Sequence, residues 1–176
     1  ARETKHAREG KPAKIVAKMN SLCDEGIIAA LYEASAAGVE IELIVRGICC
    51  LKVGIPGISE NIHVRSIVGN FLEHSRIFFF LNDGEEELYM GSADWMPRNL
   101  DRRVEILFPV LDDTLKEKVK HILDVELADN TKAHVLKPDG EYEKIDRRGK
   151  VLVNSQKQFC EEAVAAVSYT HLRAHE

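Results

Sequence analysis

Alternating and apolar segments at the start of the chain predict two strands joined by a helix. Residues 13–19 alternate between apolar and polar positions, and residues 39–45 are rich in apolar and β-branched residues, so both are typical of strands. Apolar residues in 24–37 recur at helical spacing, and Ser21 or Asp24 can cap that helix. A strand, a helix and a strand in this order predict a parallel pair with a right-handed crossover.

The middle of the chain predicts a β-hairpin and further strands. Residues 76–81 form an apolar run of strand length, Asn82-Asp83-Gly84 supplies turn residues, and residues 88–90 form the return strand. A strand expected at 103–111 contains Pro109, which cannot donate to a ladder and so indicates an edge position or a strand end. Other expected elements are strands at 62–67 and 131–136 and a polar hairpin or loop at 137–150.

Two helices are predicted in the second half. The first covers 115–128, and the last covers 156–167. Residues 168–176 (SYTHLRAHE) do not continue the pattern of the last helix, and we interpret them as a non-native tail. The inward face expected for the first of these helices consists of Leu115, Val119, Ile122, Leu123 and Leu127. We therefore expect one α/β domain over residues 1–167, with a mixed sheet flanked by helices.

Composition and charge exclude several classes of protein. The 176 residues are 45% hydrophobic and 30% charged, which is typical of one globular domain. A net charge of −5 argues against a general nucleic-acid-binding protein. The polar start lacks an initiator Met, and we interpret the chain as cut from a longer one.

Cysteine spacing and hydropathy indicate in which cellular compartment the protein is expected. The four cysteines form no CxxC pair, so neither a zinc site nor a disulfide framework is expected. No apolar run approaches the roughly 20 residues that span a membrane. We expect a cytoplasmic protein, and association with a membrane surface is left open.

Candidate chemistry gathers at His74, Arg76 and Arg46. Residues two apart on a strand project from one face, so His74 and Arg76 are expected to point at one volume. Histidine is suited to proton transfer near neutral pH or to attack on phosphorus, and arginine holds phosphate oxygens in a fixed fork. Arg46 follows the strand at 39–45, at the kind of strand end where ligands of open α/β sheets gather. We interpret the three residues as a phosphate site.

Each of these residues also has a structural alternative. His74 could be a core histidine bonded to backbone, Arg46 could form a salt bridge, and Arg76 could pair with Glu73 or Glu105. These alternatives stay open at the level of residue types and spacing.

A small-residue turn, Gly91-Ser92-Ala93-Asp94, follows about seventeen residues after His74. Gly91 allows close backbone approach, Ser92 can donate a hydrogen bond, and Asp94 can either orient an imidazole or cap the next turn. Further positive charge, in a phosphate site or in a solvated patch, follows at Arg98, Arg102 and Arg103.

These spacings resemble one half-site of the phospholipase D superfamily. That pattern is His-x-Lys, then Gly-Ser-x-Asn, then a strand with a glutamate; here it reads His74-Ser75-Arg76, Gly91-Ser92-Ala93-Asp94, Arg98-Asn99 and Glu105. Arg76 replaces the lysine, and Leu81 stands where the longer motif has an aspartate. Both departures count against phosphodiesterase activity.

Longer runs resemble the C-terminal part of the polyphosphate kinase family. They are KMNSL (18–22), EASAAGVEIELIVRGICCL (33–51), ISENIHVRSIVGNFLEHSRIFFF (58–80), SADWMPRNLDRRVEILFPV (92–110) and VNSQ (153–156). The family carries two phospholipase D-like domains, and this chain resembles the second. The resemblance implies a phospholipase D-like domain over residues 1–167.

The resemblance also implies an activity. The full enzyme would reversibly transfer the terminal phosphate of ATP to inorganic polyphosphate, with magnesium and through a phosphohistidine formed in the other domain. Arg46 would bind nucleotide phosphates, and His74 would contact the nucleotide and act as an acid/base partner. The magnesium-associated residues would lie outside this chain, so no metal ligand is expected in it. We expect this fragment to be inactive alone and the full-length enzyme to be a homo-oligomer.

Two rival functions stay open. One is a phospholipase D-like nuclease or phosphodiesterase half-site completed by dimerisation. The other is a non-catalytic module that holds polyphosphate or nucleotide. A P-loop kinase is excluded because the sequence contains no GxxxxGK[ST] motif.

Overall fold

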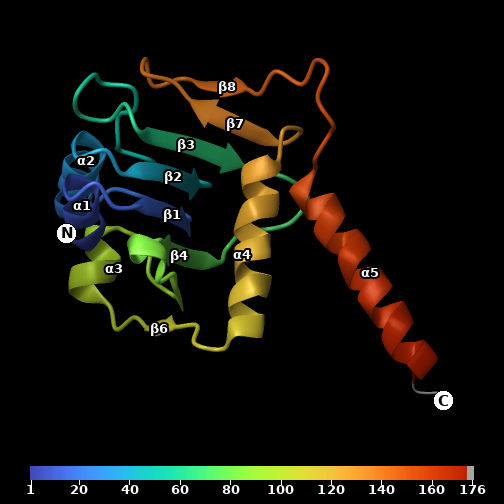
Figure 1. The fold of residues 1–176 in the computed structure, drawn as a ribbon. Helices are drawn as coiled ribbons and strands as arrows, with labels where there is room; N and C mark the ends of the chain where they lie inside the picture. The colour runs from blue at the N-terminus through green and yellow to red at the C-terminus, as the bar shows by residue number, and fades with distance from the viewer. Residues whose placement is uncertain (174–176) are drawn as a thin grey trace.

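A mixed sheet forms the centre of the computed structural model, which describes residues 1–173 and the burial of side chains up to residue 167. Within that part of the chain, eight strands lie in the order β6-β5-β4-β1-β2-β3-β7-β8 (Figure 1). Their bounds are β1 Lys14–Met19, β2 Glu40–Val45, β3 Ile62–Ile67, β4 Arg76–Phe80, β5 Glu87–Gly91, β6 Leu107–Pro109, β7 Ala133–Leu136 and β8 Tyr142–Lys144. The expected α/β class, with a mixed sheet flanked by helices, is confirmed.

The centre of the sheet is the predicted strand–helix–strand unit. β1 pairs in parallel with β2, and α2 (Glu25–Ala36) connects them. The Asp24 carboxylate accepts a hydrogen bond from the Ile27 N–H at 2.8 Å, so Asp24 is the N-cap of this helix. β2 continues in parallel to β3, whereas β4 runs antiparallel to β1.

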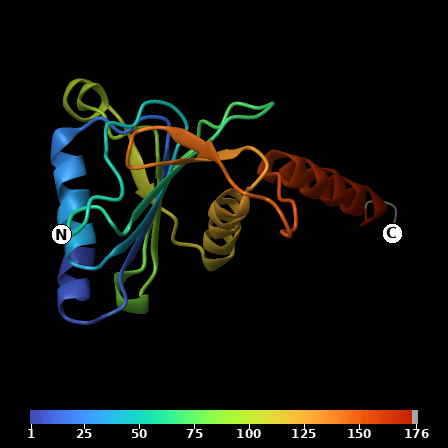
Figure 2. The same ribbon diagram turned by 90° about the horizontal axis from the view of Figure 1, so that it is seen from above.

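Helices cover both faces of the sheet. Figure 2 shows α1 (Arg2–Arg8) and α2 on one face and α4 (Asp113–Ala128) on the other, with α5 (Ser155–Arg173) extending away beside α4. Alternation along β1 sends Ile15 to the α2 side and Val16 to the α4 side, into two separate apolar clusters. Neither face of the central strands is left to solvent.

The hairpin is confirmed, but the strand expected at 103–111 is much shorter. β4 and β5 pair around the 3₁₀ turn η1 (Asn82–Gly84), and Pro109 lies in β6 at the edge of the sheet, as predicted. Residues 103–106 are not in a strand, because Glu105 is tied to Ser92 and Asn99 by its side chain. A short helix, α3 (Pro97–Arg102), was not predicted.

Two expectations about the later helices are wrong. Leu115 was placed inward but is 51% exposed, and the buried face of α4 includes Glu126 instead. The last helix does not end near residue 167, because α5 continues to Arg173. The suggested tail therefore begins inside a helix, and its residues 174–176 lie outside the described part of the chain. None of the described helices is both long and apolar enough to cross a bilayer.

Candidate active site

The ends of three strands meet at one edge of the sheet. Met19 at the end of β1 lies beside Val45 at the end of β2. Ile77 lies opposite Lys18 in the antiparallel pair, so the chain enters β4 at the edge where it leaves β1. Asn20, Arg46 and Arg76 thus lie at the same edge, where ligands of open α/β sheets bind.

Arg46 is a half-buried cation held by a neutral group. Its Nε donates to Asn20 Oδ1 at 2.8 Å, and its Nη2 donates to the same oxygen. The Ser66 hydroxyl donates to the Arg46 carbonyl at 2.9 Å and fixes the backbone. No carboxylate pairs with Arg46 among the described ion pairs, so the salt-bridge alternative is not observed. A positioned and uncompensated guanidinium is suited to an anionic ligand.

Asp94 joins these strand ends. This carboxylate is only 4% exposed, and it accepts from the Asn20 N–H at 2.7 Å. It also accepts from Nε and Nη2 of Arg76, each at 3.0 Å. Arg76 therefore pairs with Asp94 and not with Glu73 or Glu105. Asp94 neither orients the imidazole nor caps a turn; it anchors Arg76 and the start of the loop after β1.

His74 lies outside the strand in which it was expected. β4 begins at Arg76, and His74 is exposed in the irregular segment 70–75 before it. His74 and Arg76 therefore do not share a face of one strand, and that prediction is wrong. Instead, Nη1 of Arg76 donates to the His74 carbonyl at 2.7 Å. Exposure also argues against a core histidine, and no hydrogen bond of the imidazole is found among the described residues.

The turn after β5 is tied to β6. The Glu105 carboxylate accepts from Ser92 Oγ and from Asn99 Nδ2, the latter at 2.8 Å, and these two hydrogen bonds lower the pKa of Glu105. The close approach that Gly91 allows is to backbone, since a Cβ there would lie 2.6 Å from the Ile106 carbonyl oxygen. This turn thus supports the edge of the sheet.

The three arginines near this turn are exposed. Arg98 and Arg102 lie in α3, and Arg103 follows it, 4.0 Å from Glu105. The structure agrees with a solvated patch, and a role in phosphate binding stays a prediction.

Comparison with known proteins places this geometry in a family. The family model described as "Polyphosphate kinase C-terminal domain 2" matches residues 1–156. The chain belongs to the polyphosphate kinase family. Polyphosphate kinase of Pseudomonas putida is 61% identical over 142 residues, which are 81% of this chain and 20% of the relative. Polyphosphate kinase of Lactiplantibacillus plantarum is 52% identical over 165 residues, which are 94% of this chain and 23% of the relative. The chain thus spans about a fifth of the length of these relatives.

Solved structures agree with this family. The crystal structure of polyphosphate kinase from Porphyromonas gingivalis matches with a TM-score of 0.90 at 42% identity, over 94% of this chain and 25% of that one. NucT from Helicobacter pylori matches with a TM-score of 0.52 at 14% identity, over 70% of this chain and 84% of that one. This match shows a likeness of fold alone. A further neighbour, at a TM-score of 0.46, is the phospholipase D family member Nuc from Salmonella typhimurium.

Beneath the strand ends, this polyphosphate kinase domain buries an unpredicted charge cluster. Lys18 is 1% exposed, and its Nζ lies 3.3 Å from Glu73 and 3.6 Å from Glu126. Burial raises the pKa of Glu126 to about 8, and Glu73 adds to this while Lys18 opposes it. Burial would also raise the pKa of Glu73, but the hydrogen bond from Gln156 and the charge of Lys18 bring it below its usual value. At neutral pH the cluster is an ion pair of Lys18 with Glu73 beside a protonated Glu126.

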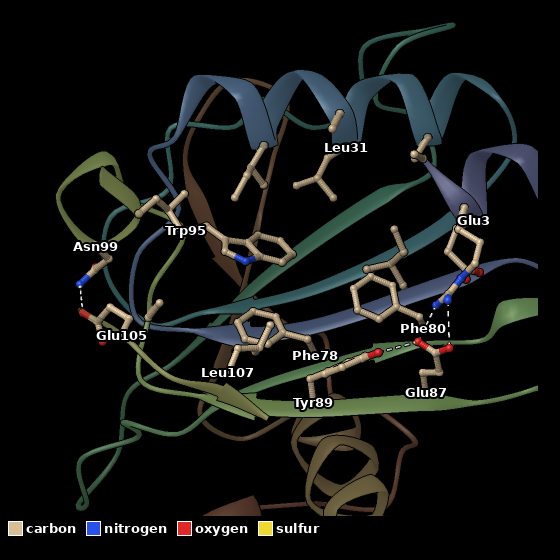
Figure 3. Close-up of a pocket in the computed structure, with 18 of the residues that line it drawn as sticks. Glu3, Leu31, Phe78, Phe80, Glu87, Tyr89, Trp95, Asn99, Glu105 and Leu107 are labelled. Atoms are coloured by element: carbon tan, nitrogen blue, oxygen red, sulfur yellow. Dashed lines mark hydrogen bonds and ion pairs between the residues drawn. The ribbon is translucent and has the colours of Figure 1, made fainter. Parts of the chain in front are cut away.

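A cavity of about 770 Å³ lies between α2 and the β4–β5 half of the sheet (Figure 3). Apolar and aromatic side chains line most of it, and Phe78 stacks on Trp95 with ring centroids 5.1 Å apart. Arg46, His74 and Arg76 do not line it. The candidate site is therefore the edge of the sheet that carries these three residues, and the cavity borders it through Ala93 and Trp95, the neighbours of Asp94.

Magnesium, which the family resemblance implies, has no evident place among these residues. Within the part of the chain that the structure describes, no group of three or more His, Cys, Asp or Glu side chains is arranged to hold a metal ion.

Proposed function

We propose that this domain forms one wall of the active site of a polyphosphate kinase, which reversibly transfers the terminal phosphate of ATP to inorganic polyphosphate. The observation that carries the proposal is a hydrogen-bond chain along one edge of the sheet. It runs from Arg46 through Asn20 and Asp94 to Arg76 and ends on the backbone of His74. Membership of the polyphosphate kinase family supports the same reading.

In this proposal Arg46 binds nucleotide phosphate and His74 is the acid/base partner. Phosphoryl transfer depends mostly on positioning and on neutralising developing charge. Arg46 offers an unpaired positive charge, and His74 offers an exposed imidazole on a fixed backbone. Arg76, first interpreted as a phosphate ligand, is reassigned to positioning because all three of its nitrogens contact Asp94 or His74.

The rest of the enzyme would supply what these residues lack. The phosphohistidine, the magnesium-associated residues and the remaining contacts to ATP belong to other parts of the full-length protein in this proposal. A cytoplasmic location and a homo-oligomeric full-length enzyme are also proposals, and they rest on the family alone.

Transplanting the domain tests the proposed function. Residues 1–167 would replace the corresponding segment of the Pseudomonas putida polyphosphate kinase, and ATP-dependent polyphosphate synthesis would be measured. His74→Ala and Arg46→Ala should each slow the chimera by roughly 10²- to 10³-fold, as expected for loss of one preorganised contact. The isolated 176-residue chain should make no polyphosphate. Synthesis by the isolated chain, or full activity of His74→Ala, would overturn the proposal.

A second candidate is a non-catalytic module that holds nucleotide or polyphosphate. One observation favours it: Arg46 is positioned as an anion ligand, while no described group orients the His74 imidazole. Calorimetry with ADP and tripolyphosphate separates the two functions. Binding that survives His74→Ala but fails in Arg46→Ala, in a chimera that keeps its activity in His74→Ala, favours the binding module.

A further inference from the structure

The segment that carries His74 is held by the first turn of α5. Nε2 of Gln156 donates to the Phe71 carbonyl at 2.9 Å, and the Phe71 N–H donates to Gln156 Oε1 at 3.0 Å. The side-chain amide therefore pairs with the backbone of residue 71 as a neighbouring strand would. The same Nε2 donates to Glu73 at 2.8 Å. One side chain, 6% exposed, thus restrains two residues just before His74.

The surrounding backbone accommodates this contact closely. A Cβ on residue 69 would lie 2.3 Å from Gln156 Oε1, so only glycine leaves room for the amide. The start of α5 is fixed as well, because the buried Asp129 carboxylate accepts from both the N–H and the hydroxyl of Ser155 at 2.8 Å. The backbone next to Gln156 is therefore fixed by Asp129, while the Gln156 side chain binds the backbone of Phe71.

Glu73 adds a second restraint from the centre of the sheet. Its carboxylate lies 3.3 Å from Nζ of Lys18, which is buried on β1. On the other flank, Arg76 donates to the His74 carbonyl. The main chain is thus fixed before and after His74, although the histidine itself is exposed.

We propose that Gln156 is a positioning residue for His74. With Glu73 and Lys18, it fixes segment 69–74 so that the imidazole faces the phosphate groups bound by Arg46. This inference rests on the proposed acid/base role of His74. Gln156 does not touch the substrate; it acts on the reaction through the backbone of its neighbours.

The test uses the chimeric polyphosphate kinase and a matched pair of glutamines. Gln156→Ala should lower kcat by roughly 10- to 100-fold, with the KM for ATP changed much less, because misplacement of a catalytic group by about 1 Å costs up to about 10²-fold. Gln158→Ala is the control: Gln158 lies two positions after Gln156 on the same helix, and its side chain donates to Glu162 at the surface. It should keep the parent rate.

Two double-mutant cycles separate positioning from a merely structural role. In the His74→Ala background, Gln156→Ala should cause no further loss, because its effect passes through His74. Gly69→Ala should slow the enzyme as Gln156→Ala does, and the Gly69→Ala/Gln156→Ala double variant should be no slower, since the shortened side chain leaves room for the new Cβ. If Gln156→Ala does not fold, Gln156→Met keeps the volume and removes the hydrogen bonds, and the same cycles apply.

The outcomes distinguish this inference from the function on which it rests. If His74→Ala is fully active, the proposed function fails. If His74→Ala is slow but Gln156→Ala matches Gln158→Ala, the positioning role is wrong. It is also wrong if Gln156→Ala slows the His74→Ala enzyme as much as it slows the parent.

Discussion

Arg76 donates two hydrogen bonds, each 3.0 Å long, to the buried carboxylate of Asp94. The pair joins β4 to the loop that follows β5, and a third nitrogen of Arg76 holds the His74 carbonyl. A lysine cannot make this two-pronged contact, because its ammonium is a single point of charge. The arginine that departs from the His-x-Lys pattern thus has a structural reason of its own.

Loss of Arg76 should destabilise the domain. Arg76→Met leaves the Asp94 carboxylate buried with one remaining donor, the Asn20 N–H, so the free energy of unfolding should fall by about 3 kcal/mol. Urea unfolding of the 176-residue chain measures this change. Arg102→Met, at an exposed position of α3, is the control and should stay within about 0.5 kcal/mol of the parent. Equal stabilities of the two variants would contradict the role given to Arg76.

The charge on Arg46 should be sensitive to its neighbour. Asn20 is neutral and accepts from Arg46, so Asn20→Asp places a carboxylate on the guanidinium and neutralises it. ADP and tripolyphosphate should then bind at least about tenfold more weakly, by the loss of more than about 1.4 kcal/mol. Asn20→Ala removes the restraint but keeps the free charge, and it should weaken binding less. Calorimetry on the three proteins decides; unchanged binding by Asn20→Asp would mean that Arg46 is not the phosphate ligand.

The sequence predicts which strands end at the edge that carries Arg46 and Arg76 better than it predicts the side-chain contacts made there. Periodicity identifies β1, α2 and β2, and Arg46 is correctly placed at a strand end. The Arg76–Asp94 pair was missed because it depends on which strands become neighbours, and that information is absent from local spacing. The sequence predicts His74 in a strand, but β4 begins only at Arg76. Glu73 pairs with Lys18 and accepts from Gln156, and these contacts hold segment 70–75 outside the strand.

Lys18 shows a second limit of pattern reading. In the alternating segment 13–19 it occupies a polar position, which would suit the solvent face of a half-buried strand. Helices cover both faces of β1, so the same position is buried, and two carboxyl groups accompany it. Lys18 is buried because α4, formed by residues 113–128, packs on the second face of the sheet, and the local pattern of residues 13–19 does not contain that information.

Glu126 should make the stability of the domain depend on pH. Its pKa is about 8 in the folded protein, above the ordinary value of 4.5, so the folded state holds a proton that the unfolded chain releases. The stabilising contribution is therefore complete below the lower value and is lost as the pH rises through the higher one. Lys18 and Glu73 are the charged groups that face it.

Glu126→Gln tests this dependence. Relative to this variant, the parent should lose at most about 1.4 kcal/mol of unfolding free energy per pH unit between about pH 5 and pH 8. Urea unfolding at three pH values within that window measures the difference, which cancels the titration of groups common to both proteins. Parallel curves for the parent and Glu126→Gln would show that Glu126 titrates normally.

The ion pair of Lys18 with Glu73 should be costly to break but replaceable as a unit. Lys18→Met leaves the Glu73 carboxylate, whose side chain is only 17% exposed, without its cation, and the domain should lose about 3 kcal/mol. Lys18→Met/Glu73→Gln removes both charges and keeps an acceptor for Gln156 Nε2, so it should recover most of that loss. Thermal unfolding of the parent, both single variants and the double variant measures the coupling. If the double variant loses the sum of the two single losses, the charges do not act as a pair, and Glu73 is held by Gln156 alone.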